Sequence, residues 1–347
     1  MSITAGLDVG GAHLKVALVE RGKAIAVEQY VCPLWQGLDK LDAALADAAP
    51  LTARAHRIAV TMTGELSDLF ESRAEGVARL VGCIADAYKG RLSFWLGQSG
   101  LGATADARAK PHDVGSTNFL ATAHVVAARH GNALLLDFGS TTADIIPIVG
   151  GRPAPTGLTD AERQRTGELV YTGFTRTAVM GVTTAALFKG QWTTLAREYL
   201  ATMADVRRVL DELEDGLDLH ATADGRGKSV GESVARLARM LGREAADGTL
   251  DDWRATARGI SEIQLRSIHD GVLQVVSRHP TVRTGPLVAA GIGADIAFVL
   301  ARRTGLEPVA FGDLIDAAPT VRRAATHSAP AVAVALLADR SEWSDSD

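Results

Sequence analysis

Two glycine-containing turns each follow an aspartate at the end of an apolar, strand-like segment. The first turn is DVGG at residues 8–11, and the second is DFGSTT at residues 137–142. A glycine-rich turn presents backbone N–H groups with no side chain in the way, and such groups bind phosphate oxygens. The adjoining carboxylates, Asp8 and Asp137, can hold Mg²⁺, usually through water, because Mg²⁺ keeps much of its hydration. The pattern predicts two turns that face each other across a cleft and hold a polyphosphate from both sides.

A third glycine turn lies where an apolar strand over 286–293 enters a helix over 294–304. Small residues there let a ligand approach the backbone, and a helix N-terminus favours an anion. Close packing of the helix on the strand is the alternative reading of these glycines. Lys15, just after the first turn, either pairs with phosphate or lies on a strand surface. The residues predicted to bind phosphate are Gly10, Gly11, Lys15, Gly139, Ser140, Thr141, Thr142, Gly291 and Gly293.

The glycine spacing excludes two common nucleotide sites. The dinucleotide fingerprint Gly-x-Gly-x-x-Gly is absent, and the first turn enters a hairpin rather than a helix, so the chain is not a Rossmann oxidoreductase. The sequence also has no Gly-x₄-Gly-Lys-Ser/Thr motif and therefore no P-loop.

Composition excludes several further classes of protein. The 347 residues include 36 Lys and Arg and 41 Asp and Glu, and the net charge of −5 lacks the electrostatic footprint of a general nucleic-acid binder. The two cysteines, Cys32 and Cys83, are too few for a disulfide framework, and we expect structural thiols in a reducing compartment. We find no signal peptide and no apolar run of about 18 residues, so we expect a cytoplasmic protein without a membrane partner.

The strand–turn–strand pattern that carries the first turn recurs about 130 residues later in the chain. An internal repeat of this size predicts two duplicated α/β lobes around a phosphate-binding cleft. The boundaries expected are an N-terminal lobe over 1–130, completed by a C-terminal helix over 325–340, and a C-terminal lobe over 131–324. Apolar periodicity predicts helices over 38–48, 67–87, 116–130, 183–187, 192–200, 205–213, 231–242, 250–277, 294–304 and 329–338.

The three glycine signatures, in this order, resemble those of the actin/Hsp70/sugar-kinase superfamily, in which two duplicated lobes close over a nucleotide. A longer set of segments resembles the hydantoinase/oxoprolinase-related family linked to tetrahydromethanopterin-dependent one-carbon metabolism. These segments are GLDVGGAHLK at 6–15, MTGELSDLF at 62–70, DFGSTTADIIP at 137–147, TDAER at 159–163, GELVYTG at 167–173 with Arg176 and Thr177, TADGR at 222–226 and RLARM at 236–240.

This resemblance implies a transferase of methanofuran or methylofuran biosynthesis. In such a reaction the phenol oxygen of a tyramine- or tyrosine-derived acceptor, γ-glutamylated in archaeal members, attacks the methyl carbon of an aminomethylfuran diphosphate. An aryl-alkyl ether forms and diphosphate leaves, with no ATP consumed. Mg²⁺ and backbone N–H groups would stabilise the charge that grows on the leaving group. The expected partners are these small-molecule substrates, and a homodimer is left open.

The phenol proton, with a pKa of about 10, needs a base, and the candidates are Asp8, Asp137 and Glu65 in no firm order. Arg176 offers a bidentate fork to phosphate or carboxylate, with an interlobe salt bridge as the alternative. Asn118 either contacts a ligand or begins a helix. Asp144 completes the predicted substrate-binding set.

Other charged residues in these segments have a structural alternative. His13 is expected to be a histidine beside the turn rather than a ligand. Asp160 joins a local charged network or reaches the amine of the substrate, and Asp224 belongs to a turn or lines the cleft.

Three other functions remain open at the level of sequence. A small-molecule kinase on the same fold would admit a purine at the third glycine turn and use a carboxylate to take the hydroxyl proton. A nucleotide-gated assembly protein and an amide hydrolase of the hydantoinase kind are less favoured. The length of the family match favours the transferase.

Overall fold

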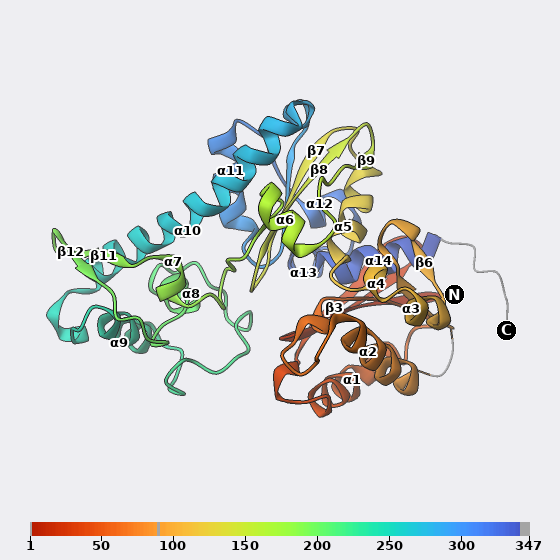
Figure 1. Cartoon of the computed structure of the whole chain (residues 1–347), viewed down its shortest axis with the longest axis horizontal. Coiled ribbons are helices and arrows are strands. Elements are labelled where there is room, and N and C mark those ends of the chain that lie inside the picture. Colours follow the sequence, from red (N-terminus) through yellow and green to blue (C-terminus); the bar gives the residue numbers. More distant parts are fainter. Residues whose placement is uncertain (1, 89–90, 341–347) are drawn as a thin grey trace.

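The computed structural model describes residues 2–88 and 91–340 of the chain. It has two α/β lobes, one built on the N-terminal part of the chain and the other on later residues (Figure 1). Each lobe contains a mixed β-sheet with helices packed on its faces, because the central strands carry apolar residues on both sides.

The sheet of the first lobe runs in the order β15-β3-β2-β1-β4-β5-β6. Its strands are β1 (Ile3–Val9), β2 (His13–Glu20), β3 (Lys23–Val31), β4 (Arg57–Met62), β5 (Arg91–Trp95), β6 (Leu101–Gly102) and β15 (Asp316–Ala317). Strands β1, β2 and β3 are antiparallel neighbours, whereas β1, β4 and β5 are parallel. Helices α1 (Asp39–Thr52) and α2 (Arg73–Ala87) supply apolar side chains to the core on one face of this sheet.

The sheet of the second lobe runs in the order β10-β8-β7-β13-β14, with β9 paired to β8. Its strands are β7 (Ala133–Phe138), β8 (Ala143–Val149), β9 (Arg152–Pro153), β10 (Leu169–Val170), β13 (Leu287–Ala290) and β14 (Pro308–Ala310). Helices α10 (Leu250–Arg278) and α11 (Ala294–Thr304) pack on one face of this sheet. The arrangement β2-β1-β4, an antiparallel hairpin followed by a parallel strand, recurs as β8-β7-β13. The two lobes are therefore duplicates, and the expected pair of duplicated α/β lobes is confirmed.

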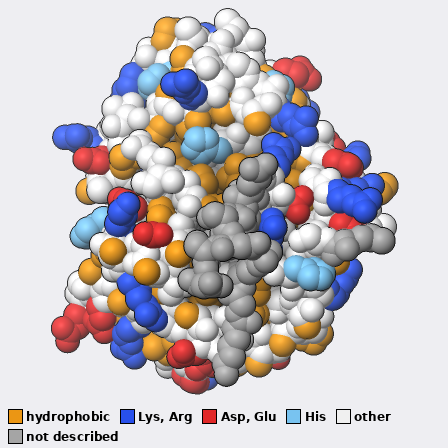
Figure 2. Space-filling model, turned by 90° about the vertical axis from the view of Figure 1, so that its right-hand side faces the viewer, with side chains coloured by type: hydrophobic (Ala, Val, Ile, Leu, Met, Phe, Trp, Pro, Cys, Tyr) orange, Lys and Arg blue, Asp and Glu red, His pale blue; other side chains and the backbone are white. Residues whose placement is uncertain are grey.

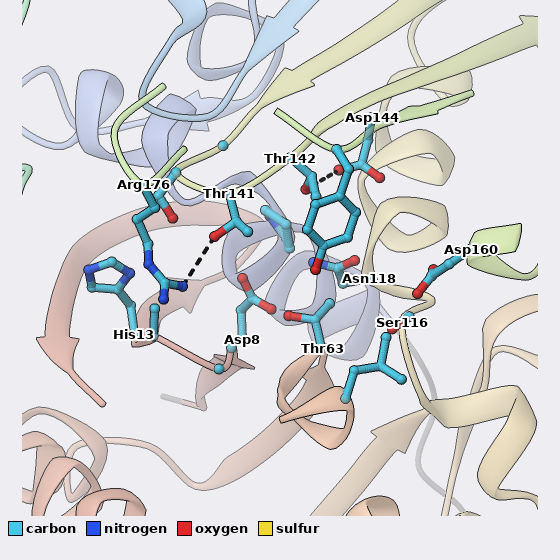
Figure 3. Close-up of a pocket in the computed structure, with 18 of the residues that line it drawn as sticks. Asp8, His13, Thr63, Ser116, Asn118, Thr141, Thr142, Asp144, Asp160 and Arg176 are labelled. Carbon is cyan, nitrogen blue, oxygen red and sulfur yellow. Dashed lines mark hydrogen bonds between the residues drawn. The ribbon is translucent and has the colours of Figure 1, made fainter. Parts of the chain in front are cut away.

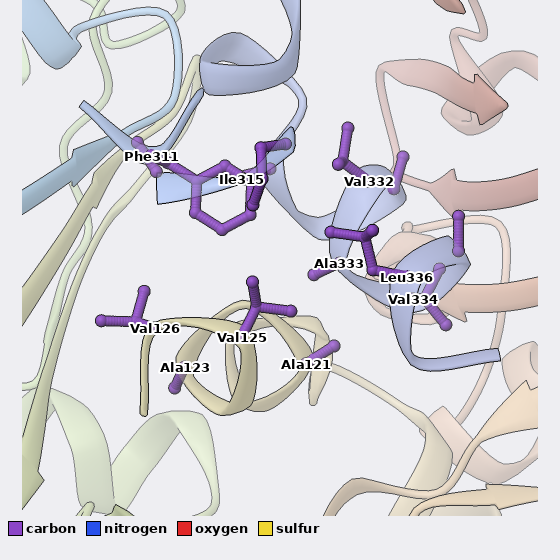
Figure 4. Packing of buried hydrophobic residues seen from close by; sticks show 14 of the residues in the cluster. Ala121, Ala123, Val125, Val126, Phe311, Ile315, Val332, Ala333, Val334 and Leu336 are labelled. Atoms are coloured by element: carbon purple, nitrogen blue, oxygen red, sulfur yellow. The ribbon is translucent and has the colours of Figure 1, made fainter. Parts of the chain in front are cut away.

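Two helices cross between the lobes. Helix α5 (Asn118–Ala127) contacts β7, β8 and β9, whereas α14 (Ala329–Arg340) contacts β1, β2 and β4. The two helices also pack on each other through alanine and valine side chains, as seen in Figure 4. Small side chains let the helix axes approach closely. Residues of both sheets join this interlobe core.

Gly6 of β1 shows how close that approach is. A β-carbon at this position would lie 2.0 Å from the carbonyl oxygen of Ala331 and 2.8 Å from the Cβ of Ala335, both in α14. Only glycine fits between β1 and this helix.

The remaining helices and strands lie in the segments between those already described. They are α3 (Thr104–Ala109), α4 (Pro111–Val114), α6 (Asp160–Thr166), α7 (Val179–Val182), β11 (Ala185–Phe188), β12 (Gln191–Thr194), α8 (Met203–Val209), α9 (Val230–Met240), α12 (Phe311–Leu314) and α13 (Arg322–His327). Short 3₁₀ helices are η1 (Leu34–Gln36), η2 (Gly64–Leu66), η3 (Gly97–Ser99), η4 (Ala245–Asp247) and η5 (Pro280–Thr284). Helices α7 to α9 and the β11–β12 hairpin share a small core around Trp253.

The prediction of helices over 183–187 and 192–200 is wrong, because this segment forms the β11–β12 hairpin. Phe188 pairs with Gln191, and the two residues between them, Lys189 and Gly190, have φ angles of 48° and 79°. Positive φ at both central residues favours a tight hairpin turn. The buried side chains alternate with the exposed Leu187, which is the period of a strand rather than a helix.

Three other helices depart from their predicted bounds, and one of them is α8, which ends at Val209 rather than at residue 213. Helix α2 begins at Arg73 rather than at residue 67, because Ser72 is its N-cap and accepts a hydrogen bond from the backbone N–H of Glu75. Helix α5 covers 118–127 of the predicted 116–130, because Ser116 has a φ of 54° and cannot lie in a right-handed helix.

The longest helix, α10, is too polar to cross a bilayer, and no other helix among residues 2–88 and 91–340 meets the length and apolarity that a membrane span requires. On the face shown in Figure 2, basic and acidic side chains of the described residues are interspersed.

We expect Gly6→Ala to destabilise the protein by about 2–3 kcal/mol, because a methyl group forced against α14 overpacks the contact between the lobes. Chemical denaturation followed by circular dichroism measures this free energy of unfolding. Gly82→Ala is the matched control: a β-carbon there meets nothing within 4 Å, and alanine favours the helix interior. Equal stabilities of the two variants would contradict the close packing of α14 on β1.

Candidate functional site

A pocket of about 440 Å³ lies between the two lobes, where the turns of both hairpins meet. The first lobe contributes the β1–β2 turn, Trp35, Thr63 and the segment after η2. The second lobe contributes the β7–β8 turn, the start of α6 and the segment after β10. The N-terminal ends of the crossing helices also reach the pocket, through Asn118 of α5 and Pro330 of α14.

The two hairpin turns have the same backbone geometry. The N–H of Gly10 donates to the carbonyl of His13 at 2.9 Å, and the N–H of Gly139 donates to the carbonyl of Thr142 at 2.9 Å. Gly10 and Gly139 therefore close their hairpins and do not offer free donors. Among the residues that the structure describes, the other turn amides donate to no protein group; they belong to Gly11, Ala12, Ser140, Thr141 and Thr142. These amides are available to an anion.

Asp8 and Asp137 are the last polar residues of equivalent strands, and both line the pocket. Their side chains are almost fully buried, with exposed fractions of 5% and 9%. Burial raises the pKa of Asp137 to about 7, with the negative charges of Asp144 and Asp8 adding to the rise and Lys15 opposing it. Burial also raises the pKa of Asp8, against the opposing effects of Lys15 and Asn118.

Lys15 lies directly across the β1–β2 ladder from Asp8, so the two side chains share one face of the sheet. Its ammonium group is 3.9 Å from the carboxylate of Asp8. Lys15 therefore brings a positive charge to the pocket floor beside both predicted metal ligands.

Arg176 approaches from the second lobe. Its guanidinium donates to the hydroxyl of Thr141 at 3.3 Å and lies 4.9 Å from the ring centre of Trp35, which belongs to the first lobe. The interlobe salt bridge that the sequence allowed for Arg176 is absent among the described residues, and a cation–π contact takes its place. The guanidinium faces the pocket without a carboxylate partner (Figure 3).

Carboxylates and an amide occupy the other side of the pocket in Figure 3. Asp144 accepts a hydrogen bond from Arg163 at 2.6 Å, and Asp160 pairs across the lobes with Arg73 at 3.2 Å. Asn118 is the first residue of α5, so it both begins a helix and lines the pocket.

Glu65 does not line this pocket. Its carboxyl is 1% exposed and accepts a hydrogen bond at 2.6 Å from the hydroxyl of Ser116, which does line it. Burial raises the pKa of Glu65, with the Ser116 hydrogen bond and Arg73 opposing the rise. Glu65 supports the wall of the pocket from behind.

Gly291 and Gly293 also lie outside the lining of the pocket. The N–H of Gly291 donates to the carbonyl of Thr326, and that of Gly293 donates to the carbonyl of Phe138, each at 2.9 Å. A β-carbon at either glycine would lie within 2.5 Å of Phe138. The alternative reading, close packing of helix on strand, describes both positions, and the predicted phosphate contact finds no free N–H there.

Several pocket residues were not predicted from the sequence, and Trp35 is the most informative of them. Its side chain is 41% exposed, and nothing in the local sequence indicates that a tryptophan in η1 contacts the second lobe. His13, expected to be structural, is buried and lines the pocket. Asp224 does not line it, because Arg236 and Arg239 bind its carboxylate.

Asp8 and Asp137 fit a Mg²⁺ site of the kind in which water supplies most ligands. Asp8 has a buried carboxylate oxygen with no hydrogen-bond partner in the described structure, and burial raises the pKa of both aspartates even with Lys15 beside them. The described residues contain no cluster of three or more histidine, cysteine or acidic side chains placed to hold a metal. A site with fewer protein ligands matches the hydration that Mg²⁺ retains.

The fold and the pocket define a two-lobed α/β protein whose cleft is lined by two glycine turns with free amides. Residues 56–340 match the family described as Hydantoinase/oxoprolinase, and the chain belongs to that family. This match confirms the family resemblance identified in the sequence.

Two curated relatives bear the same name, (4-{4-[2-(gamma-L-glutamylamino)ethyl]phenoxymethyl}furan-2-yl)methanamine synthase. The protein from Methanocaldococcus jannaschii is 28% identical over 292 residues, which cover 84% of this chain and 86% of the relative. The protein from Methanococcus vannielii is 31% identical over 165 residues, covering 48% of this chain and 72% of the relative.

Solved structures of similar fold are more distant. One is the activator of the 2-hydroxyisocaproyl-CoA dehydratase from Clostridium difficile with bound ADPNP, at 13% identity and a TM-score of 0.44, covering 97% of this chain and 94% of that one. Another is a ROK family glucokinase from Streptomyces griseus in complex with glucose and AMPPNP, at 13% identity and a TM-score of 0.43, covering 96% and 98%.

The raised pKa of Asp137 predicts a pH-dependent stability. The folded state favours the protonated carboxyl, so without divalent cations the wild-type protein should lose stability as the pH rises from about 4 towards 7. Asp137→Asn should therefore be more stable than wild type at pH 8, by on the order of 2–4 kcal/mol, and similar to it at pH 4.

Urea denaturation at a series of pH values measures this difference. Asp68→Asn, at an exposed position on the pocket rim, is the control and should follow the wild-type curve. A constant difference between Asp137→Asn and wild type from pH 4 to 8 would exclude a buried, protonated Asp137.

Proposed function

We propose that the protein is a transferase of methanofuran or methylofuran biosynthesis. In this proposal it joins an aminomethylfuran-methyl diphosphate to the phenol oxygen of a tyramine- or tyrosine-derived acceptor, including γ-glutamyl forms, and releases diphosphate. The observation that carries the proposal is the match to the Methanocaldococcus jannaschii synthase over most of both chains. The name of that relative describes a phenoxymethyl-furan, which contains the ether that such a reaction would form.

The pocket supports this reaction at its leaving group. The free amides of Gly11, Ser140 and Thr141, together with Lys15 and Arg176, can surround the diphosphate. As the C–O bond to diphosphate breaks, negative charge grows on the oxygens that these donors face, which lowers the barrier. Mg²⁺ held through Asp8 would add its own positive charge to the leaving group when bound, which leaves the carboxylate of Asp137 free to accept a proton.

The phenol must lose its proton as its oxygen attacks the furanylmethyl carbon. Asp137 suits this role best of the three candidates, because it lines the pocket and its pKa of about 7 matches a general base near neutral pH. Glu65 is less suited, because its carboxyl lies behind Ser116. The proton of the phenol moves to the carboxylate, the aryl oxygen forms the ether bond, and diphosphate leaves with the bonding electron pair.

The kinase alternative finds less support. A kinase of this fold would place a purine beside the third glycine turn, and Gly291 and Gly293 lie outside the pocket with their N–H groups bonded to protein carbonyls. No further observation favours the kinase over the transferase.

The test is an incubation of purified protein with Mg²⁺, an aminomethylfuran diphosphate and a panel of tyrosine, tyramine and their γ-glutamyl forms, without ATP. Mass spectrometry and diphosphate release should report ether and diphosphate in equal amounts, and chelation of Mg²⁺ should stop both. A stoichiometric requirement for ATP, or formation of ADP with a phenol or alcohol, would replace the proposal with the kinase.

We expect Asp137→Asn to lower kcat in that assay by on the order of 10²–10³-fold, as for loss of a general base. Glu65→Gln is the comparison, because glutamine has the shape of the protonated carboxyl that burial favours at this position. This variant should keep kcat within about threefold of wild type, since a neutral side chain there leaves the pocket lining intact. A larger loss with Glu65→Gln than with Asp137→Asn would transfer the role of base to Glu65.

A further inference from the structure

One end of the pocket is lined by a histidine, an arginine and a tryptophan, and a second histidine packs against two of them from behind. His13 and Trp35 come from the first lobe, and Arg176 and His220 come from the second. The loop over 211–229, which joins α8 to α9, carries His220 across to the β1–β2 turn. No ion pair to a carboxylate involves these histidines or Arg176 among the residues that the structure describes.

His13 is the least expected member of this group. It is the first residue of β2, its side chain is 6% exposed, and it lines the pocket. Its Nε2 atom is buried and has no hydrogen-bond partner in the described structure. No hydrogen bond among the described residues occupies the imidazole, so the ring can donate to a ligand that enters the pocket.

Arg176 lies beside the His13 imidazole in Figure 3. One guanidinium nitrogen donates to Thr141, and the ring of Trp35 packs on the guanidinium from the other lobe. Both contacts fix the orientation of the guanidinium and leave its charge without a counter-ion. A guanidinium with free N–H groups is suited to phosphate, which it can bind through two hydrogen bonds.

The two histidines are in ring contact. Their centroids lie 4.6 Å apart in an edge-to-face arrangement, and His220 also lies 5.5 Å from the ring of Trp35. Burial lowers the pKa of His13 to about 2, with His220, Lys15 and Arg176 acting in the same direction. The imidazole of His13 is therefore neutral in the absence of ligand and has one N–H to donate.

We propose that His13 and Arg176 form a subsite for the outer phosphate of a diphosphate-bearing ligand, with an N–H of the His13 imidazole and the guanidinium as donors. Trp35 and His220 act as positioning residues that orient these two groups. The inference rests on the proposed function for the identity of the ligand, the diphosphate of the donor substrate. It extends that function by assigning the outer phosphate to the His13 end of the pocket.

Inorganic diphosphate with Mg²⁺ is the probe, and isothermal titration calorimetry gives its Kd for the full chain. Two substitutions separate hydrogen bonding from packing at His13. His13→Phe keeps a ring against His220 but has no donor, whereas His13→Gln keeps an N–H donor and loses the ring. We expect His13→Phe to raise the Kd by about tenfold or more, and His13→Gln to raise it by less than about threefold.

Trp35 has its own pair of variants. Trp35→Phe keeps an aromatic face for the guanidinium of Arg176, and Trp35→Ala removes it. Only Trp35→Ala should raise the Kd several-fold, about as expected for loss of a partly exposed cation–π contact. His112→Gln, at an exposed position outside the pocket, is the control and should bind as wild type does. Thermal melts of all variants identify any that fail to fold.

The outcomes separate the subsite from the proposed function. If His13→Gln binds more weakly than His13→Phe, or both bind as wild type does, His13 is structural and the subsite is wrong. If the expected order of Kd values is found but no ether forms in the ATP-free assay, the subsite stands and the transferase proposal fails. Failure of the wild-type protein to bind diphosphate at all would overturn both.

Discussion

The crossing of α5 and α14 is the contact on which the pocket depends. Helix α5 covers one face of the second sheet and α14 covers one face of the first, and the two helices pack on each other between the lobes. Asn118 begins α5, and Pro330 is the second residue of α14; both line the pocket. The packing of small side chains that joins the lobes therefore also sets how far apart the two glycine turns lie. A rigid core beneath the pocket keeps their free amides aimed at one volume.

The basic and acidic side chains of the pocket lie on different sides of it. At one end, positive or neutral donors have no acidic partner, while on the other side Asp144 and Asp160 are already bound by arginines. The buried aspartates of the two hairpins lie between, and burial makes their ionisation unfavourable without a cation. Such an arrangement suits a polyanion that binds together with a metal ion. The polyanion accepts from the donors at one end of the pocket, and the metal ion neutralises the buried aspartates.

The sequence predicted the duplication, both hairpin turns and the equivalent positions of Asp8 and Asp137 in one cleft. These features depend on local patterns that repeat. The sequence could not show that Gly291 serves packing, since a glycine needed for close approach looks the same whether the neighbour is a ligand or Phe138. Trp35 and His220 were missed because their meeting depends on how two lobes are placed, not on spacing. The hairpin over 185–194 was missed because its tight turn, Lys189-Gly190, outweighs the helix propensity of the residues around it.

The position of α14 also constrains how the protein can fold during synthesis. Strand β1 leaves the ribosome long before the helix that packs on it, which spans residues 329–340, more than 300 residues later in the chain. Until those residues emerge, one face of the first sheet has no cover, and Gly6 lies in an exposed apolar surface. Closure of so long a loop is entropically costly and slow. The first lobe to be made is therefore the last to be completed.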